Sequence, residues 1–386
     1  MRKGYTIHRA AANIFYQNIE EIVQEYSGSQ TQIIAFGSNI LMSMSIDYLE
    51  KRGLTVSAII DNDKRREGMV IFGKKVYLPP KLIAQLKGQD FVVLVASSHD
   101  QEMIRQLIDL GCDPSQNIRH FFDYNAVLDD YSHVDRRDMR VLTEGEFRKQ
   151  QITILKEVDE LCTENHLRYY LGAGTLLGAV RHKGYIPWDD DVDIHMPVTD
   201  MIKLSKLLEA DDRFGVLSQF DGENYFGLGM GYMVDYSGFS DINKFPVQLT
   251  TGSSIDIIPL FGMPSGEKEF LQYAVEVKRL EQECWSTLCS ETEHREAIKN
   301  LNDYFLHFDY EESEIVGNIM QVSFLKFCFP RAFLGEAART EFEGEMLCIP
   351  EQWDKYLEHL YGNYMELPPV EKRTAAHHCR SYKKLE

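Results

Sequence analysis

The sequence predicts an α/β protein with at least two domains, and three observations lead to this expectation. Short runs of apolar and β-branched residues alternate with helical patterns between about residues 30 and 125. An acidic segment with few large apolar side chains follows, which suits a solvated connector. A chain of 386 residues, 44% of them apolar, is also long enough for more than one core. We therefore expect a first domain at residues 1–125, a connector at 126–145 and a second domain at 146–386.

The first domain shows the alternation of strands and helices most clearly. The expected strands are residues 33–36, 55–60 and 91–96, and the expected helices are residues 40–52 and 101–110. Each strand is a short apolar run, and each helix has apolar residues at helical spacing. Strands that alternate with helices usually form a parallel sheet. The first domain is therefore predicted to be an α/β Rossmann-like domain.

One glycine of the first domain raises the question of nucleotide binding. Gly37 lies at the first strand-helix turn and Asp61 ends the next strand 24 residues later, which is the geometry of the dinucleotide-binding fingerprint. The turn lacks the second and third glycines of that fingerprint, which allow the pyrophosphate and the helix to approach closely. The domain also resembles small Rossmann-like domains that are attached to sugar-modifying enzymes. Nucleotide binding and a structural or assembly role both stay open.

The composition excludes some classes of protein. A net charge of -19 argues against a general nucleic-acid binder, which usually carries a basic face. We find no secretory signal pattern and no apolar run of about 18 residues that could span a membrane. Seven cysteines, an odd number, fit reduced thiols. We expect a cytoplasmic protein, with peripheral attachment to the inner face of the cell membrane as an open alternative.

The second domain is expected to begin with a helix at residues 144–166, which leads to a glycine-rich turn. An apolar strand runs into Gly172, Gly174 and Thr175, and the next helix is expected at 176–181. Backbone N–H groups at a helix N-terminus, together with a hydroxyl, can bind an anion. By itself such a turn is a weak signal, because many such turns only reverse the chain.

A cluster of acidic residues strengthens the signal. Four of these acids, Asp189, Asp190, Asp191 and Asp193, follow the basic residues near 182, and Asp256 lies between isoleucines in a second strand-like run. Crowded carboxylates repel one another and are costly to desolvate, which indicates a cation between them. Residues two apart in a strand share a face, so Asp191 and Asp193 could chelate one ion with Asp256 as a third ligand. Oxygen ligands favour Mg²⁺ or Mn²⁺, and we expect Asp190 to face solvent.

The residues from 171 to 193, with the sequence LGAGTLLGAVRHKGYIPWDDDVD, resemble the signature of the LicD family. This family comprises bacterial phosphocholine transferases related to the fukutin-related proteins. The likeness continues at residues 255–260, 342–350 and 361–369, and covers about residues 145 to 380. It implies an α+β nucleotidyltransferase-like domain with a helical C-terminal part.

The resemblance also implies an activity. Such an enzyme transfers a phosphorylated alcohol from a CDP-activated donor, typically CDP-choline, to a sugar hydroxyl of a teichoic acid or lipopolysaccharide precursor. By motif, Asp191, Asp193 and Asp256 would bind the metal, Asp189 would lie at the reacting centre, and Gly172, Gly174 and Thr175 would line the donor phosphates. Charge that develops on the bridging oxygen could be stabilised by Arg181. Further candidates for donor binding are Lys183, Trp188, Arg373 and His378.

Several alternatives stay open at this point. The cargo could be ribitol phosphate, glycerol phosphate or a nucleotide, and the protein could instead be a non-catalytic assembly protein of a glycan-modifying complex. The glycan acceptor could be lipid-linked, and oligomer formation is undecided.

Two further sites are weighed. A choline headgroup would require an aromatic box. Its candidates are Trp188, Tyr185, Tyr232 and Tyr236. Cys284, Cys289 and His294 are either zinc ligands or ordinary core residues, since the spacing is not that of a zinc finger. The basic tail that contains Arg373 and His378 either is solvated or folds back on the donor phosphates.

Overall fold

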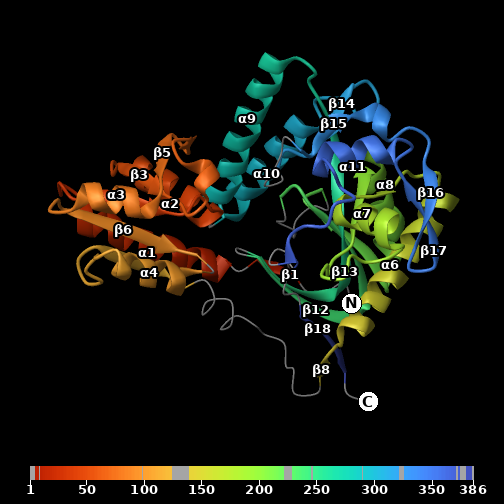
Figure 1. The fold of residues 1–386 in the computed structure, drawn as a ribbon, viewed down its shortest axis with the longest axis horizontal. Coiled ribbons are helices and arrows are strands. Elements are labelled where there is room, and N and C mark those ends of the chain that lie inside the picture. The colour runs from red at the N-terminus through yellow and green to blue at the C-terminus, as the bar shows by residue number, and fades with distance from the viewer. Residues whose placement is uncertain are drawn as a thin grey trace. The chain divides into compact units, whose positions relative to one another are not determined.

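The structure is a computed structural model (Figure 1). It describes residues 5–7, 9–97, 99–123, 139–220, 228–244, 247–288, 290–320, 326–370, 373 and 380–384. The chain forms two compact units, which we describe separately. The N-terminal unit comprises His8–Ser132 and Gln282–Ala297, and the second unit comprises Met1–Ile7, His133–Glu281 and Ile298–Glu386.

The boundaries of these units differ from the expected domains at Met1–Ile7, which belongs to the second unit, and at residues 282–297. Residues 282–297 had been placed in the second domain, but they belong to the N-terminal unit. The physical reason is a set of buried contacts: the Tyr16 hydroxyl donates a hydrogen bond to the Trp285 carbonyl at 2.9 Å. Leu288 and His294, from the same segment, are also almost fully buried.

A mainly parallel sheet forms the centre of the N-terminal unit. Its strand order is β4 (Val70–Ile71), β5 (Lys74–Tyr77), β3 (Val56–Ile60), β2 (Gln32–Phe36), β6 (Phe91–Ala96) and β7 (Ile118–Phe122). All neighbouring strands are parallel except β4 and β5. The expected strands at 33–36, 55–60 and 91–96 are confirmed to within one residue.

In the part of this unit that the structure describes, four helices before residue 124 accompany the sheet. They are α1 (Arg9–Tyr26), α2 (Ile40–Lys51), α3 (Pro79–Leu86) and α4 (Asp100–Asp109). Apolar residues of α3 and α4, such as Leu82 and Leu107, share one buried core with Ile34 and Val93 of the sheet. Helices α1 and α2 contact one another and the strands β7, β2 and β3. The α/β class predicted for this part of the chain is thus confirmed, as are the helices expected at 40–52 and 101–110.

The second unit has a mixed sheet whose central strand is β13 (Val247–Met263). On one side, β13 pairs in parallel with β10 (Asp193–Pro197), which pairs with β9 (Tyr170–Leu171). The other strands of this sheet are β12 (Gly231–Lys244), β11 (Phe214–Ser218), β18 (Arg380–Lys384), β8 (Met139–Val141), β14 (Ile315–Gly317), β15 (Cys328–Pro330) and β1 (Tyr5–Ile7).

Helices and one hairpin complete the second unit. They are α6 (Glu144–Glu164), α7 (Ala173–His182), α8 (Val198–Leu207), α11 (Trp353–Tyr361) and the hairpin of β16 (Ala338–Phe342) with β17 (Glu345–Ile349). Two helices, α9 (Glu267–Ser286) and α10 (Glu291–Phe305), contribute residues to both units. The helix expected at 144–166 is confirmed by α6, which begins with a capping box between Thr143 and Glu146.

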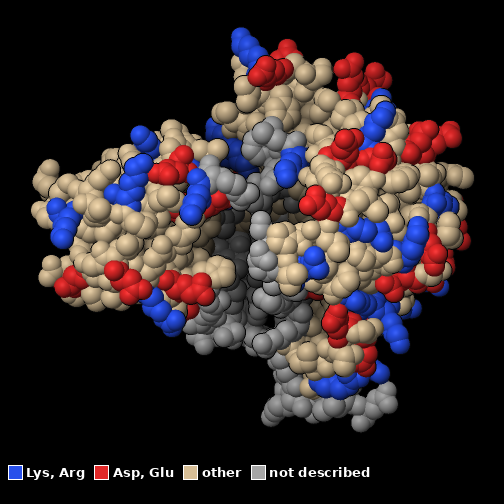
Figure 2. Space-filling view, viewed as in Figure 1, with Lys and Arg blue, Asp and Glu red and all other residues tan. Residues whose placement is uncertain are grey.

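Acidic and basic side chains are interspersed on the face that Figure 2 shows. On the face drawn in Figure 2, the described part of neither unit carries a continuous patch of lysine and arginine. Of the helices that the structure describes, none is both long and apolar enough to cross a membrane.

Small residues allow α7 to pack closely against its surroundings. A Cβ atom at Gly178 would lie 2.5 Å from the backbone oxygen of Gly184, and a Cβ atom at Gly172 would lie 2.8 Å from the ring of His195. Contacts this short do not occur between real Cβ atoms and their neighbours, so a larger residue would displace the helix or the loop. The glycines of this segment are therefore required by packing.

We expect Gly178→Ala to destabilise the protein by about 1 to 3 kcal/mol, because the new methyl group overlaps the Gly184 carbonyl. Gly145→Ala in α6 is the matched control, since a Cβ atom there meets nothing within 4 Å. The control should be neutral or more stable by up to about 1 kcal/mol. Urea unfolding of both variants tests this, and equal midpoints would contradict the packing argument.

Candidate active site

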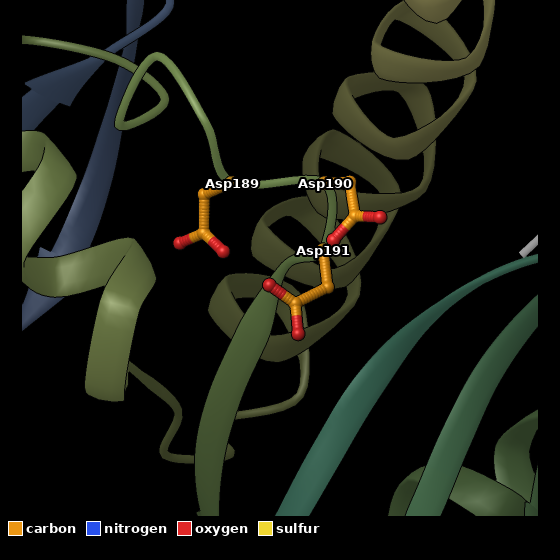
Figure 3. Close-up of side chains that lie close together, drawn as sticks. All are labelled: Asp189, Asp190 and Asp191. Atoms are coloured by element: carbon orange, nitrogen blue, oxygen red, sulfur yellow. The ribbon is translucent and has the colours of Figure 1, made fainter. Parts of the chain in front are cut away.

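The acidic loop lies directly before β10, and three of its carboxylates are close together. Asp189, Asp190 and Asp191 each offer an oxygen atom within 4.8 Å of the others, and all three are half-buried. Their side chains project from one short stretch of loop beside α6 (Figure 3). Two unit charges at 4.8 Å repel by about 3 kcal/mol at an effective dielectric constant of about 20. Such a cluster therefore favours a bound cation.

Two further acids lie on adjacent strands. Asp193 of β10 lies directly opposite Asp256 of β13 in the parallel register. The Asp256 N–H donates to the Val192 carbonyl at 2.8 Å, which joins the loop to β13. Val192 and Ile194 are fully buried, as the strand pattern predicted. The sequence therefore placed Asp193 and Asp256 correctly as neighbours.

The structure corrects one expectation about the acids. Asp190, which we had expected to face solvent, is half-buried and belongs to the group of three close carboxylates. Asp191 precedes β10 instead of lying within it. Among the described residues, the group within 4.8 Å is Asp189 with Asp190 and Asp191, whereas the sequence grouped Asp191 with Asp193 and Asp256. The latter set stays a prediction.

Helix α6 holds the backbone of the acidic loop. The Arg148 guanidinium donates to the Asp189 carbonyl at 2.8 Å, and the Gln151 amide donates to the Asp190 carbonyl at 3.4 Å. The Tyr185 hydroxyl donates to Gln151 Oε1 at 2.9 Å, and Arg148 lies 4.6 Å above the Tyr185 ring. Arg148 and Gln151 were not among the site residues predicted from the sequence. The only available signal was their spacing of three on a helix.

The glycine-rich turn supports the acids through backbone contacts. Gly172 N–H donates to the Asp193 carbonyl at 2.9 Å, and the buried Thr175 hydroxyl accepts a hydrogen bond from Asp193 N–H at 2.8 Å. A Cβ atom at Gly174 would lie 2.7 Å from Asp189 Oδ2. Two groups predicted to line donor phosphates thus hold Asp193 in the sheet, and the third leaves room for the Asp189 carboxylate. The helix begins at Ala173 and not at 176 as expected.

Ala173, the first residue of α7, has a strained backbone that a hydrogen bond to Tyr356 supports. Ala173 has a φ of 41°, in the left-handed region, which typically costs a non-glycine residue about 1 to 3 kcal/mol. Its N–H donates to the Tyr356 hydroxyl at 3.2 Å, and the same hydroxyl forms a hydrogen bond with His195 Nε2. Burial lowers the pKa of His195 to about 4, so the ring is neutral near neutral pH. A neutral pair therefore supports the start of the helix.

Two cations lie near the other end of α7. Arg181 donates to the Tyr364 carbonyl at 2.8 Å, and Arg373 donates to the Pro368 carbonyl at 2.8 Å while its guanidinium lies 5.4 Å from the Trp188 ring. Desolvation lowers the pKa of Arg181, and the positive charge of Arg373 lowers it further. These three predicted site residues are thus brought together. Lys183 is exposed at the end of α7, and His378 lies outside the described residues.

The sequence analysis also did not identify Tyr361, the last residue of α11. Its side chain is 43% exposed, yet desolvation of the hydroxyl raises its pKa. Asp193, Asp189 and Asp191 raise this pKa further, whereas Arg181 lowers it. The hydroxyl therefore lies within the field of both the acids and the cation and stays protonated, as a hydrogen-bond donor.

The two further sites weighed from the sequence fare differently. Tyr185 and Tyr232 are buried, so they cannot present open faces to a choline headgroup, whereas Trp188 is half-buried and lies beside Arg373. His294 Nδ1 lies 2.8 Å from the Cys284 carbonyl oxygen, and both residues are buried. Cys289 lies outside the described residues, so the zinc site stays a prediction.

Comparison with known proteins agrees with the resemblance found in the sequence. Residues 166–259 match the family model described as LicD/FKTN/FKRP, nucleotidyltransferase domain. The chain is 24% identical over 272 residues to the lipopolysaccharide cholinephosphotransferase LicD of Haemophilus influenzae, and the match covers 61% of this chain and 97% of that protein.

Other relatives match over a smaller share of their length. An uncharacterised protein of Rickettsia prowazekii is 41% identical over 68 residues, which is 18% of this chain and 26% of that protein. Mannosyltransferase regulator 14 of Saccharomyces cerevisiae is 24% identical over 233 residues, which is 56% of this chain and 24% of the regulator. The resemblance to the LicD family is confirmed, and it reaches eukaryotic proteins.

Thr175→Val should destabilise the protein by about 1 to 3 kcal/mol, because the buried Asp193 N–H loses its acceptor while the side-chain volume hardly changes. Thr175→Ser keeps the hydroxyl and should retain most of the stability. Thr153→Val, on the exposed face of α6, is the control and should change stability by less than about 0.5 kcal/mol. The measurement is urea unfolding, and a Thr175→Val midpoint equal to that of the wild type would show that the hydrogen bond does not support Asp193.

Proposed function

We propose that this protein transfers phosphocholine from CDP-choline to a sugar hydroxyl of a cell-surface glycan precursor, of the teichoic acid or lipopolysaccharide type. The observation that carries the proposal is the group of close carboxylates at Asp189, Asp190 and Asp191, within the segment that matches the LicD family model. The similarity to a lipopolysaccharide cholinephosphotransferase over 97% of its length supports the choice of cargo. In this proposal the second unit is nucleotidyltransferase-like with a helical C-terminal part, and the N-terminal unit is Rossmann-like.

The acids fit a divalent cation of the Mg²⁺ or Mn²⁺ type. These ions prefer oxygen ligands, and among the described residues the group within 4.8 Å consists of three half-buried carboxylates. We propose Asp191, Asp193 and Asp256 as the ligands predicted by sequence, with Asp189 and Asp190 close by. When bound, such an ion would offset the negative charge of the donor diphosphate.

The remaining chemistry falls to side chains of this chain. The sugar oxygen forms a bond to the β-phosphorus of the donor, the bond to the bridging oxygen breaks, and CMP leaves. Asp189, whose carboxylate lies against Gly174 at the start of α7, would take the proton of the sugar hydroxyl. Arg181 and Arg373 repel one another unless an anion lies between them, which suits the donor phosphates. Trp188, beside Arg373, would contact the donor.

A second candidate function has specific support. Two matching yeast proteins are named mannosyltransferase regulators, which favours an assembly or regulatory role in a glycan-modifying complex. In that case the N-terminal unit would organise partners. Transfer of ribitol phosphate, glycerol phosphate or a nucleotide by the same acids is a third candidate. All of these proposals place the protein in the cytoplasm, with peripheral membrane attachment if the acceptor is lipid-linked.

Incubation of the protein with Mg²⁺ or Mn²⁺, a glycan acceptor and a panel of CDP-alcohols tests the reaction through CMP release. We expect CDP-choline to give the fastest release and EDTA to stop it. If only another CDP-alcohol gives CMP release, the transferred group is that alcohol phosphate and not phosphocholine. A protein that consumes no donor but supports glycan modification in cells in an EDTA-insensitive manner would favour the regulatory candidate.

Asp191→Asn and Asp193→Asn should each lower CMP release by at least about 100-fold, because each removes a charge of the site and hardly any volume. Asp303→Asn, an exposed aspartate of α10, is the control for a lost carboxylate and should retain full activity. Circular dichroism checks that the variants fold. Turnover near the wild-type rate in either variant would refute the assignment of these acids.

A further inference from the structure

Two side chains of α6, those of Arg148 and Gln151, hold the backbone of the acidic loop. We call this pair of side chains the bracket. They lie one turn apart on the helix and donate to the carbonyls of two consecutive residues, Asp189 and Asp190, at 2.8 Å and 3.4 Å. Within the loop, the Asp189 N–H donates to the Ile186 carbonyl at 2.9 Å. The loop that carries the close carboxylates is therefore held from a helix that precedes it by about 40 positions in the chain.

The bracket contacts backbone carbonyls of the acidic loop and not its carboxylates. Like charges within 4.8 Å of one another push the loop open when no cation is bound. The bracket bonds carbonyl oxygens, so it resists this repulsion without using the carboxylate oxygens of Asp189 and Asp190. The negative charge of those oxygens lies beside Asp191, the proposed ligand, and attracts a divalent cation.

The bracket itself is rigid. Arg148 forms an ion pair with Glu144 at 2.7 Å and lies 4.6 Å above the Tyr185 ring. Gln151 is 2% exposed, and its Oε1 accepts a hydrogen bond from the Tyr185 hydroxyl at 2.9 Å. The helix begins with a capping box, which fixes its first turn. The donor groups thus occupy set positions before any ligand binds.

We propose that Arg148 and Gln151 are positioning residues that hold the backbone of the acidic loop at Asp189 and Asp190, and thereby place the next residue, Asp191, where it can bind a divalent cation. This inference rests on the proposed function, because it assumes that the acids bind a metal. Residues that orient metal ligands from outside typically contribute about 10- to 100-fold in metal affinity. The bracket should therefore affect metal binding before any donor is present.

Charge and positioning predict opposite effects at Arg148. A cation next to the acids repels a metal ion, so removal of its charge alone should tighten metal binding. Loss of the hydrogen bond to the Asp189 carbonyl should weaken metal binding. Gln151 is neutral, so its replacement tests positioning without any change of charge.

The experiment is a titration of the full-length protein with Mn²⁺, followed by electron paramagnetic resonance in the absence of donor. We expect Arg148→Met and Gln151→Met to raise the Mn²⁺ dissociation constant by about 10- to 100-fold. Arg148→Lys keeps the charge and one donor, and should fall between Arg148→Met and the wild type. Lys156→Met, on the same helix and paired with Glu345, is the control for a lost positive charge and should bind as the wild type does.

Two further measurements separate positioning from general packing. Tyr185→Phe removes the hydroxyl that donates to Gln151 but keeps the ring beside Arg148 and both bonds to the loop carbonyls, so it should weaken Mn²⁺ binding less than Gln151→Met does. Where the wild type releases CMP, a high Mn²⁺ concentration should restore kcat in Gln151→Met but not in Asp191→Asn. Thermal unfolding identifies any variant that fails to fold. If Arg148→Met or Gln151→Met fails to fold, Arg148→Lys decides the test, because residue 148 is only half-buried and lysine keeps the charge.

The outcomes are distinct. Unchanged or tighter Mn²⁺ binding in Arg148→Met and Gln151→Met would overturn the inference, as would a wild type that does not bind Mn²⁺. A wild type that binds Mn²⁺ but consumes no CDP-alcohol would refute the proposed activity, while the binding data would still decide the role of the bracket.

Discussion

The parallel pairing of β10 with β13 is the constraint on which the rest of the candidate site depends. It sets Asp193 opposite Asp256 and leaves the neighbouring isoleucines in the core. A shift of the register by one residue would turn these carboxylates into the core and the apolar side chains outward, at a prohibitive cost of burial. Hydrogen bonds from Gly172 and to Thr175 then attach α7 to the same strand.

Close packing of α7 against β10 and the acidic loop brings the glycine-rich turn next to the acids. The Gly172 backbone lies on the His195 ring, and Gly174 leaves space for the Asp189 carboxylate. The Tyr356 hydroxyl forms hydrogen bonds with the Ala173 N–H and with His195, whose ring is neutral. The start of α7 is therefore supported by uncharged groups. The acids and the cations Arg181 and Arg373 therefore remain the main charges of the site.

The sequence correctly predicted secondary structure that depends on short-range patterns of apolar residues. Apolar runs identified β2, β3 and β6, and a run of alternating residues identified the buried partners of Asp193. The sequence could not predict contacts between segments far apart in the chain. Arg148 has no feature of its own that distinguishes it from other surface arginines, and Tyr361 gains its meaning only from carboxylates more than 150 positions away. Asp190 was misplaced because alternation applies within a strand, and the loop before β10 is not one.

The buried segment Gln282–Ala297 of the N-terminal unit has a consequence for how the protein is made. The unit formed by His8–Ser132 lacks this segment until residues 282–297 have been synthesised and have left the ribosome. Trp285 and Leu288 would otherwise leave apolar surface of that unit uncovered. The N-terminal unit can therefore be complete only after Ala297 has left the ribosome, when most of the second unit has also been synthesised.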